Sequence, residues 1–164
     1  MPDSGQHHRP GPSVCSRRAQ KNGGQAQQAL GRSRGGFSTK IHVSVDALGN
    51  PLCFTLTGGQ QHDSTQSASL TIGFECEYVI ADRSYDADDF IQLIIDIGAL
   101  PVIPPRKNRT KQREYDEHLY KERHLVECFI GRFKHYRRLF SRFEKLACRF
   151  LAFLSLAATL IWLR

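Results

Sequence analysis

Two stretches that alternate polar and apolar residues, residues 40–45 and 51–57, most constrain what this chain of 164 residues can fold into. Alternation with a period of two places every second side chain on the same face, which is typical of strands with one buried face. Between the two stretches, Gly49 and Asn50 are residue types that favour a tight turn. The pattern predicts a β-hairpin whose turn lies near these two residues.

After the predicted hairpin, short apolar runs alternate with helical patterns. Residues 62–65 offer N-cap side chains for a short helix that runs to about residue 70. Residues 78–81 and 100–104 are the short apolar runs of buried strands, and residues 86–97 between them have apolar side chains at helical spacing. A strand, a helix and a second strand in this order favour a parallel pair, so we predict an α/β fold.

Two longer helices are predicted in the C-terminal part, over residues 116–138 and 144–163. On the first, four apolar residues share one face and form a predicted core stripe: Val126, Phe129, Ile130 and Phe133. The second contains the most apolar stretch of the chain, residues 150–163. Its 14 residues are fewer than the roughly 20 that a membrane span needs, so we expect a buried helix and no membrane partner.

Opposite charges are segregated along the chain. Residues 1–40 carry 7 basic and 1 acidic residues, residues 41–105 carry 1 and 9, and residues 106–164 carry 15 and 6. The formal net charge of +7 favours polyanionic partners, with nucleic acid first among them. An acidic centre between basic flanks suits divalent cations at the centre and phosphates at the rims, although solvated charged faces would give the same pattern.

The cysteines and the N-terminus indicate a cellular compartment. The 5 cysteines form no C-x-x-C pair and are odd in number, which argues against a disulfide framework or a zinc site. The first residues lack the apolar core of a secretory signal peptide. Both features favour the reducing cytoplasm.

Candidate chemistry lies on the first C-terminal helix. At 100° per residue, Tyr120, Arg123, Glu127 and Lys134 fall within a sector of about 60°. A carboxylate flanked by two cations can bind a metal while the cations meet phosphate oxygens. Asp82 stands at the end of an apolar strand, where α/β sheets bind ligands, and could supply a second carboxylate. An ordinary helix with exposed charges and a solvated turn aspartate are the alternative interpretation.

The spacing Tyr120-x2-Arg123-x3-Glu127-x6-Lys134 resembles the Y-(2)-R-(3)-E-(6)-K signature of DDE transposases of the insertion-sequence 4 and 5 groups. Four further segments are similar to blocks of the insertion-sequence 5 family, namely residues 31–42, 56–63, 80–86 and 102–106. The resemblance covers about residues 19–164.

The resemblance implies an RNase H-like catalytic domain over residues 37–164, with a mixed sheet and flanking helices. Such a domain cuts and rejoins DNA with two divalent ions, Mg²⁺ or Mn²⁺, held by an Asp, Asp, Glu triad. Asp82 would be the second aspartate and Glu127 the glutamate, both catalytic and both metal ligands. Residues that support the site or contact DNA would be Tyr120, Arg123, Lys134, Arg106 and Lys107. For His62 and Asp63 the resemblance leaves open structural capping or catalysis.

The chain departs from the resemblance at the first aspartate, which the family places on a central strand in a block reading roughly D-S-T-I-V-R-A-H-Q. One permitted set of codons for residues 5–14, read from its second base, encodes this block. We therefore hypothesise that residues 1–17 are an out-of-frame translation of it, that residues 1–36 are a disordered or frameshifted segment, and that the sheet lacks its first central strand. Asp3 is an alternative first aspartate, but Pro10 and Pro12 oppose a central strand after it.

The expected function is DNA transposition by metal-dependent cleavage and strand transfer at transposon ends, impaired in this copy by loss of the first aspartate. Expected partners are double-stranded DNA, both terminal inverted repeats and target DNA, and further copies of the chain or intact transposase. The expected localisation is the bacterial cytoplasm, at the nucleoid when the protein is bound to DNA. Two alternatives are a noncatalytic DNA-binding fragment that modulates intact transposase, and an unrelated RNase H-like nuclease.

Overall fold

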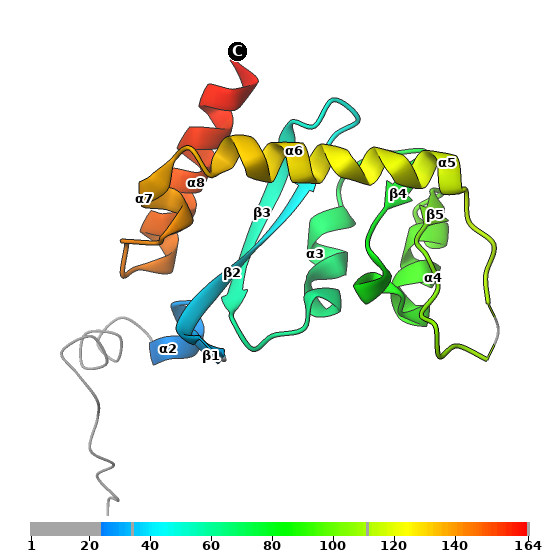
Figure 1. Cartoon of the computed structure of the whole chain (residues 1–164), viewed down its shortest axis with the longest axis horizontal. Helices are drawn as coiled ribbons and strands as arrows, with labels where there is room; N and C mark the ends of the chain where they lie inside the picture. The colour runs from blue at the N-terminus through cyan, green and yellow to red at the C-terminus, as the bar shows by residue number, and fades with distance from the viewer. Residues whose placement is uncertain (1–23, 34, 111, 164) are drawn as a thin grey trace, which may run out of the picture.

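The computed structural model describes residues 24–33, 35–110 and 112–163, and these form the predicted α/β structure (Figure 1). The strands are β1 (Gly31–Ser33), β2 (Gly36–Val45), β3 (Pro51–Gly58), β4 (Tyr78–Ile80) and β5 (Leu100–Val102). The α-helices are α2 (Gly24–Gln27), α3 (Ser67–Thr71), α4 (Asp88–Asp96), α5 (Glu117–Tyr120), α6 (His124–Phe133), α7 (Arg137–Phe140) and α8 (Ala147–Trp162). Three 3₁₀ turns connect them: η1 (Asp63–Gln66), η2 (Arg83–Tyr85) and η3 (Lys121–Arg123).

β2 and β3 form the predicted antiparallel hairpin. At its turn, Asp46 Oδ1 accepts hydrogen bonds from the backbone N of Leu48 and of Asn50, both at 2.8 Å. Burial pushes the pKa of Asp46 up, but these hydrogen bonds outweigh it and hold the pKa below its ordinary value. Gly49 has φ of 79°, a conformation that glycine adopts without steric cost. The ionised carboxylate and the glycine together fix the turn.

Residues 24–33 contradict the expectation of an unstructured segment up to residue 36. They form α2 and β1, and β1 pairs antiparallel with the start of β2. The Arg142 guanidinium holds them in place by donating to the O of Gln28 at 2.8 Å and to the O of Ala29 at 3.3 Å. The sequence pattern did not predict that these residues are structured, because the cation that stabilises them, Arg142, comes from the far end of the chain. Asp3 and the hypothesis of a frameshift over residues 1–17 lie outside the described residues.

β4 and β5 run parallel, with α4 in the connection between them, as predicted. One face of α4 packs with the residues that flank β5 in a cluster of five buried residues: Phe90, Ile91, Ile94, Ala99 and Ile103. The helix begins at Asp88 rather than at Asp86, because the carboxylate of Asp86 binds the loop that follows β5.

α5, η3 and α6 follow one another directly from Glu117 to Phe133, so the predicted helix ends earlier than residue 138. Phe129 and Phe133 are buried, and each ring centroid lies 6.1 Å from that of Phe54 on β3. The chain turns after Phe133, and Leu139 of α7 joins the same cluster. The prediction of Ile130 in the core is wrong. The hairpin packs against the face of α6 that carries Phe129 and Phe133, and Ile130 remains 39% exposed.

α8 packs one face against the hairpin. Its buried residues recur at helical spacing: Phe150, Leu154, Ala157, Ala158 and Ile161. Trp162 Nε1 donates to the O of Pro51 at 2.8 Å, which ties the end of the helix to β3. The expectation of a buried helix is half wrong, since the opposite face exposes Phe153, Leu156 and Leu160. None of the helices within the described ranges has the length and apolar character to cross a membrane.

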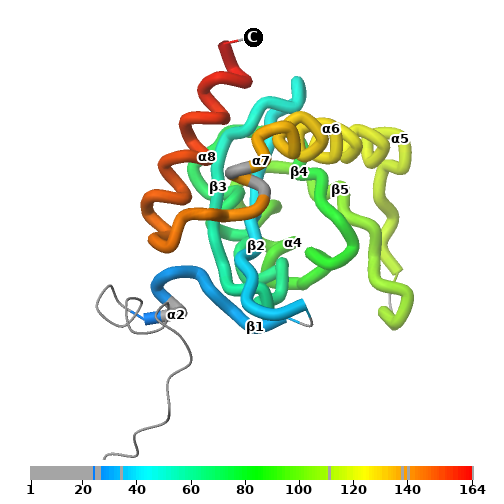
Figure 2. Tube along the Cα trace, turned by 60° about the vertical axis from the view of Figure 1, so that its left-hand side comes forward, coloured from blue at the N-terminus to red at the C-terminus, as the bar shows by residue number. Residues whose placement is uncertain are grey.

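The described strands form two sheets where a single mixed sheet is expected. β1, β2 and β3 make one antiparallel sheet, and β4 and β5 make a separate parallel pair. Each sheet has its own apolar cluster, and α8 lies along β3 on the side away from β4 and β5 (Figures 1 and 2). The continuous helical segment made of α5, η3 and α6 spans both sheets, with α6 against β2 and α5 against β5. Among the residues that the structure describes, β4 and the second half of β2 each have one edge without a strand partner.

Candidate active site

Asp82 stands just beyond the carboxyl end of β4. It is the N-cap residue of η2 in an extended conformation, and its O accepts a hydrogen bond from the N of Tyr85 at 2.9 Å. The side chain is 56% exposed. This is the position at which a parallel strand pair presents residues to a ligand, as the sequence predicts.

Arg123 links Asp82 to Glu127. Arg123 Nη2 lies 2.7 Å from Glu127 Oε1, one helical turn further on, and Arg123 Nη1 lies 4.0 Å from Asp82 Oδ2. The two carboxylates come from different halves of the fold, one from the end of β4 and one from α6. The shared helix face of Arg123 and Glu127 is therefore observed, and Asp82 lies at the same guanidinium.

Tyr120 supports this cation. The Arg123 guanidinium carbon lies 5.9 Å from the centroid of the Tyr120 ring, a cation–π distance. The Tyr120 ring is itself packed edge-on against Tyr115, with centroids 5.6 Å apart. Lys134 is the exposed C-cap residue of α6, about 10 Å along the helix axis from Glu127 at 1.5 Å per residue.

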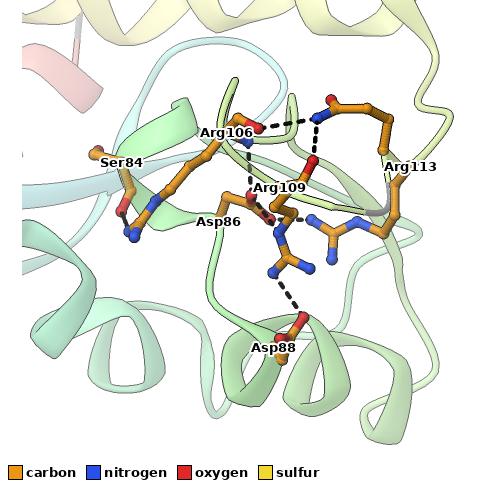
Figure 3. A network of polar contacts seen from close by, with 7 residues as sticks. Ser84, Asp86, Asp88, Arg106, Arg109 and Arg113 are labelled. Carbon is orange, nitrogen blue, oxygen red and sulfur yellow. Dashed lines mark hydrogen bonds and ion pairs between the residues drawn. The ribbon is translucent and has the colours of Figure 1, made fainter.

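The predicted residues Arg106 and Lys107 lie on the loop after β5. Arg106 Nη2 donates to the O of Ser84 at 2.9 Å, so its guanidinium contacts the turn that follows Asp82 (Figure 3). Lys107 is exposed. Arg106 therefore contacts the Asp82 turn, and Lys107 lies at the surface.

Sequence reasoning did not single out Asp86, which receives the most polar contacts in this region. Its side chain has no exposed area and is held by Arg109, by Arg113 and by the backbone of Arg106 (Figure 3). The available signal was the run of aspartates at residues 82–89 followed by the basic loop at residues 106–113. Residue spacing alone does not show that these two segments meet.

His62 and Asp63 have separate surroundings. His62 precedes η1 without a side-chain capping hydrogen bond, so the expectation of capping fails for its ring. Asp63 Oδ1 pairs with Lys40 Nζ at 3.0 Å. Burial raises the pKa of Tyr85 to about 12, and the charges of Asp63 and Asp82 contribute to that rise. Asp63 therefore lies near the Asp82 turn and forms an ion pair with Lys40 of β2.

The donor set suits one divalent cation. Asp82 and Glu127 offer carboxylate oxygens, and Mg²⁺ is commonly held by one or two carboxylates together with substrate phosphates. Across the described ranges, no group of three or more His, Cys, Asp or Glu side chains could hold a metal ion. Within the described ranges, Asp82 and Glu127 are the two carboxylates that would hold an ion here, and no third carboxylate joins them.

Comparisons with known proteins place the chain in a family. Residues 13–162 match the family model described as "Transposase DDE domain". The chain is 41% identical over 130 residues to "Putative transposase for insertion sequence element IS6501" of Brucella ovis, covering 78% of this chain and 100% of that protein. It is 34% identical over 135 residues to "Putative transposase for insertion sequence element IS402" of Burkholderia cepacia, covering 75% of this chain and 62% of that protein. No solved structure matches the chain. The chain therefore belongs to the family of transposases with a DDE domain.

Proposed function

We propose that this chain carries the second and third carboxylates of a metal-dependent site that cleaves DNA and transfers strands at the ends of an insertion sequence. The observation that supports this most strongly is the meeting of Asp82 and Glu127 at one guanidinium, although they come from different halves of the fold. Two exposed carboxylates beside a fixed cation can bind a divalent ion and a phosphate together.

Each residue of the proposed site has a role that follows from its place. Asp82 and Glu127 would hold the ion, Mg²⁺ or Mn²⁺, which when bound would stabilise charge that develops on phosphate oxygens. Arg123, steadied by Tyr120, donates to a phosphate oxygen beside the carboxylates. The exposed Lys134 and Lys107 are proposed to contact the phosphates of flanking double-stranded DNA. Arg106 is proposed to hold the Asp82 turn in place.

The proposed architecture is an RNase H-like sheet without its first central strand. Its support is the division of the described strands into two separate sheets, in which β4 and the second half of β2 each keep one edge without a strand partner. A strand between them would join the two sheets into one mixed sheet. The nucleotide sequence across codons 1–20 tests the origin of the gap. A shifted frame that encodes the D-S-T block supports the frameshift hypothesis, and its absence from all three frames contradicts it.

Calorimetric titration with Mn²⁺ tests the proposed ligands. Wild-type protein should bind Mn²⁺ weakly, and Asp82→Asn and Glu127→Gln should each abolish binding, because each removes one of two carboxylates. Asp96→Asn is the matched control, since Asp96 is an exposed carboxylate at the end of α4. Equal Mn²⁺ binding by all four folded proteins, verified by far-UV circular dichroism, would contradict the proposed ligands.

A strand-transfer assay on terminal-repeat DNA tests the proposed impairment. With two carboxylates of three, the purified chain should cleave DNA at background rate in Mg²⁺ or Mn²⁺. Rapid cleavage by the purified chain would show that the site is complete and the impairment proposal wrong.

The second candidate function is a noncatalytic DNA-binding fragment that modulates intact transposase, alone or in mixed oligomers. The lack of a third carboxylate in the described site favours it. In that case Asp82→Ala should bind duplex DNA as wild type does, with steep salt dependence, and should slow cleavage by an intact relative when added to it. No effect on the intact enzyme would argue against this function.

A further inference from the structure

Asp86 is an acidic side chain with no exposed area, and the described residues of the basic loop, 106–110 and 112–113, include three arginines that contact it (Figure 3). Asp86 Oδ2 accepts hydrogen bonds from the backbone N of Arg106 at 2.8 Å and from Arg109 Nε at 2.7 Å. Asp86 Oδ1 accepts from Arg113 Nη2. One buried carboxylate thus binds the loop at three positions along its length.

The carboxylate of Asp86 is held in its ionised form. Burial alone would raise the pKa of Asp86, but the hydrogen bonds from Arg106 and Arg109 and the charges of Arg113 and Arg109 lower it below its ordinary value. Removing one partner from a buried ion pair leaves an uncompensated charge and is strongly destabilising. The loop therefore cannot leave Asp86 without a large cost in free energy.

The same contacts reach the turn that carries Asp82. Asp82 and Asp86 flank η2, and the N of Asp86 donates to the O of Arg83 at 3.2 Å within that turn. Arg106 donates through its backbone to Asp86 and through its guanidinium to the O of Ser84. Asp82, at one end of the turn, faces the Arg123 cation, and Asp86, at the other end, faces the basic loop.

We propose that Asp86 is a positioning residue, which locks the basic loop at residues 106–113 against the Asp82 turn. The Asp82 carboxylate and the loop's exposed Lys107 then meet DNA as one rigid unit. This inference rests on the proposed function, because it assigns the loop to DNA.

Locking the loop also determines which of its cations remain for DNA. Arg109 donates to Asp88 at 2.6 Å as well as to Asp86, and Arg113 pairs with Asp86. Both arginines are neutralised within the protein, so they contribute little to phosphate binding. Lys107 is exposed at the turn of the loop. Loss of the Asp86 charge would free Arg113 and leave Arg109 with Asp88 as its acidic partner.

Two substitutions of equal charge test this inference. Asp86→Asn and Asp88→Asn each remove one negative charge and both leave Arg109 one acidic partner fewer, but only Asp86→Asn also frees Arg113 and loosens the loop. Limited trypsin digestion measures cleavage after Arg106, Lys107 and Arg109. Binding to a random-sequence DNA duplex at several salt concentrations gives the number of phosphate contacts.

The two readouts have defined expected results. Asp86→Asn should speed cleavage within the loop at least about tenfold, because an opened loop is cleaved in proportion to its population. It should also steepen the slope of log K against log salt concentration by about 0.9 for each arginine that gains a phosphate. Asp88→Asn should leave both quantities near their wild-type values. General destabilisation would not steepen the salt slope, so this readout separates positioning from mere loss of structure.

Arg113→Gln is a second variant in case Asp86→Asn does not fold, since it removes a partly exposed partner of the same carboxylate. It should speed cleavage after Lys107 without steepening the salt slope. A loop that resists trypsin in the folded variants, or an unchanged salt slope in folded Asp86→Asn, would overturn the inference. If wild-type protein binds no duplex, the proposed function fails instead, and the digestion alone still decides whether Asp86 holds the loop.

Discussion

Replacing Phe129 with alanine should weaken the packing of α6, the helix that carries Glu127, against the hairpin and should lower the unfolding free energy. Phe129 is 1% exposed, and its ring centroid lies 6.1 Å from that of Phe54 and 5.4 Å from that of Phe133. Truncation of a buried phenylalanine costs about 3–5 kcal/mol, through lost burial and the cavity left behind. This is a large share of the roughly 5–15 kcal/mol that stabilises a typical domain.

Urea denaturation, followed by far-UV circular dichroism and by Trp162 fluorescence, measures this loss. With an m-value of about 2 kcal/mol/M, the Phe129→Ala midpoint should fall by about 2 M. Phe143→Ala is the control, because Phe143 is 72% exposed and its loss should change the unfolding free energy by less than about 0.5 kcal/mol. Phe129→Leu keeps most of the volume and should lose about 1 kcal/mol. Equal midpoints for Phe129→Ala and Phe143→Ala would refute the packing described for α6.

Two further predictions concern the hairpin and the segment that precedes β1. Burial lowers the pKa of His42 below 6.5, beside a smaller opposing effect of Asp63, so the unfolded chain binds more protons below that pH and the unfolding free energy should fall as the pH drops below about 6.5. His42→Gln should flatten this fall, and parallel pH profiles from urea titrations would count against it. Arg142→Ala should lower the unfolding free energy by about 2 kcal/mol, because it leaves the O of Gln28 and of Ala29 without this charged donor. The exposed Arg137→Ala is its control in thermal melts, and equal melting temperatures would exclude that role.

Local patterns predicted the elements whose signals are contained in a few residues. The hairpin follows from alternation around Gly49 and Asn50, and the face shared by Arg123 and Glu127 follows from 100° per residue. The division into two sheets has no such signal, since it depends on which strand edges meet. Likewise, the exposed face of α8 is as apolar in sequence as the buried one, so periodicity could not tell them apart.

Contacts between distant segments were the part of the site that sequence could not provide. Asp86 is one of several aspartates in residues 82–89, and only the fold brings Arg109 and Arg113 to it. Arg106 was expected to support the site or to contact DNA, and the partner of its guanidinium, the O of Ser84, is a backbone atom that no sequence motif identifies. Such contacts need the backbone path of the loop, which residue types do not encode locally.

Mapping of the bound ion by polypeptide cleavage tests the central claim most directly, that Asp82 and Glu127 together hold a divalent cation. Fe²⁺ in place of Mg²⁺, with ascorbate and hydrogen peroxide, produces radicals that cut the chain close to the ion. We predict cuts near Asp82 and near Glu127, suppressed by excess Mg²⁺ and absent in Asp82→Asn and in Glu127→Gln. Cuts elsewhere, or cuts near these residues that both variants retain, would contradict the account.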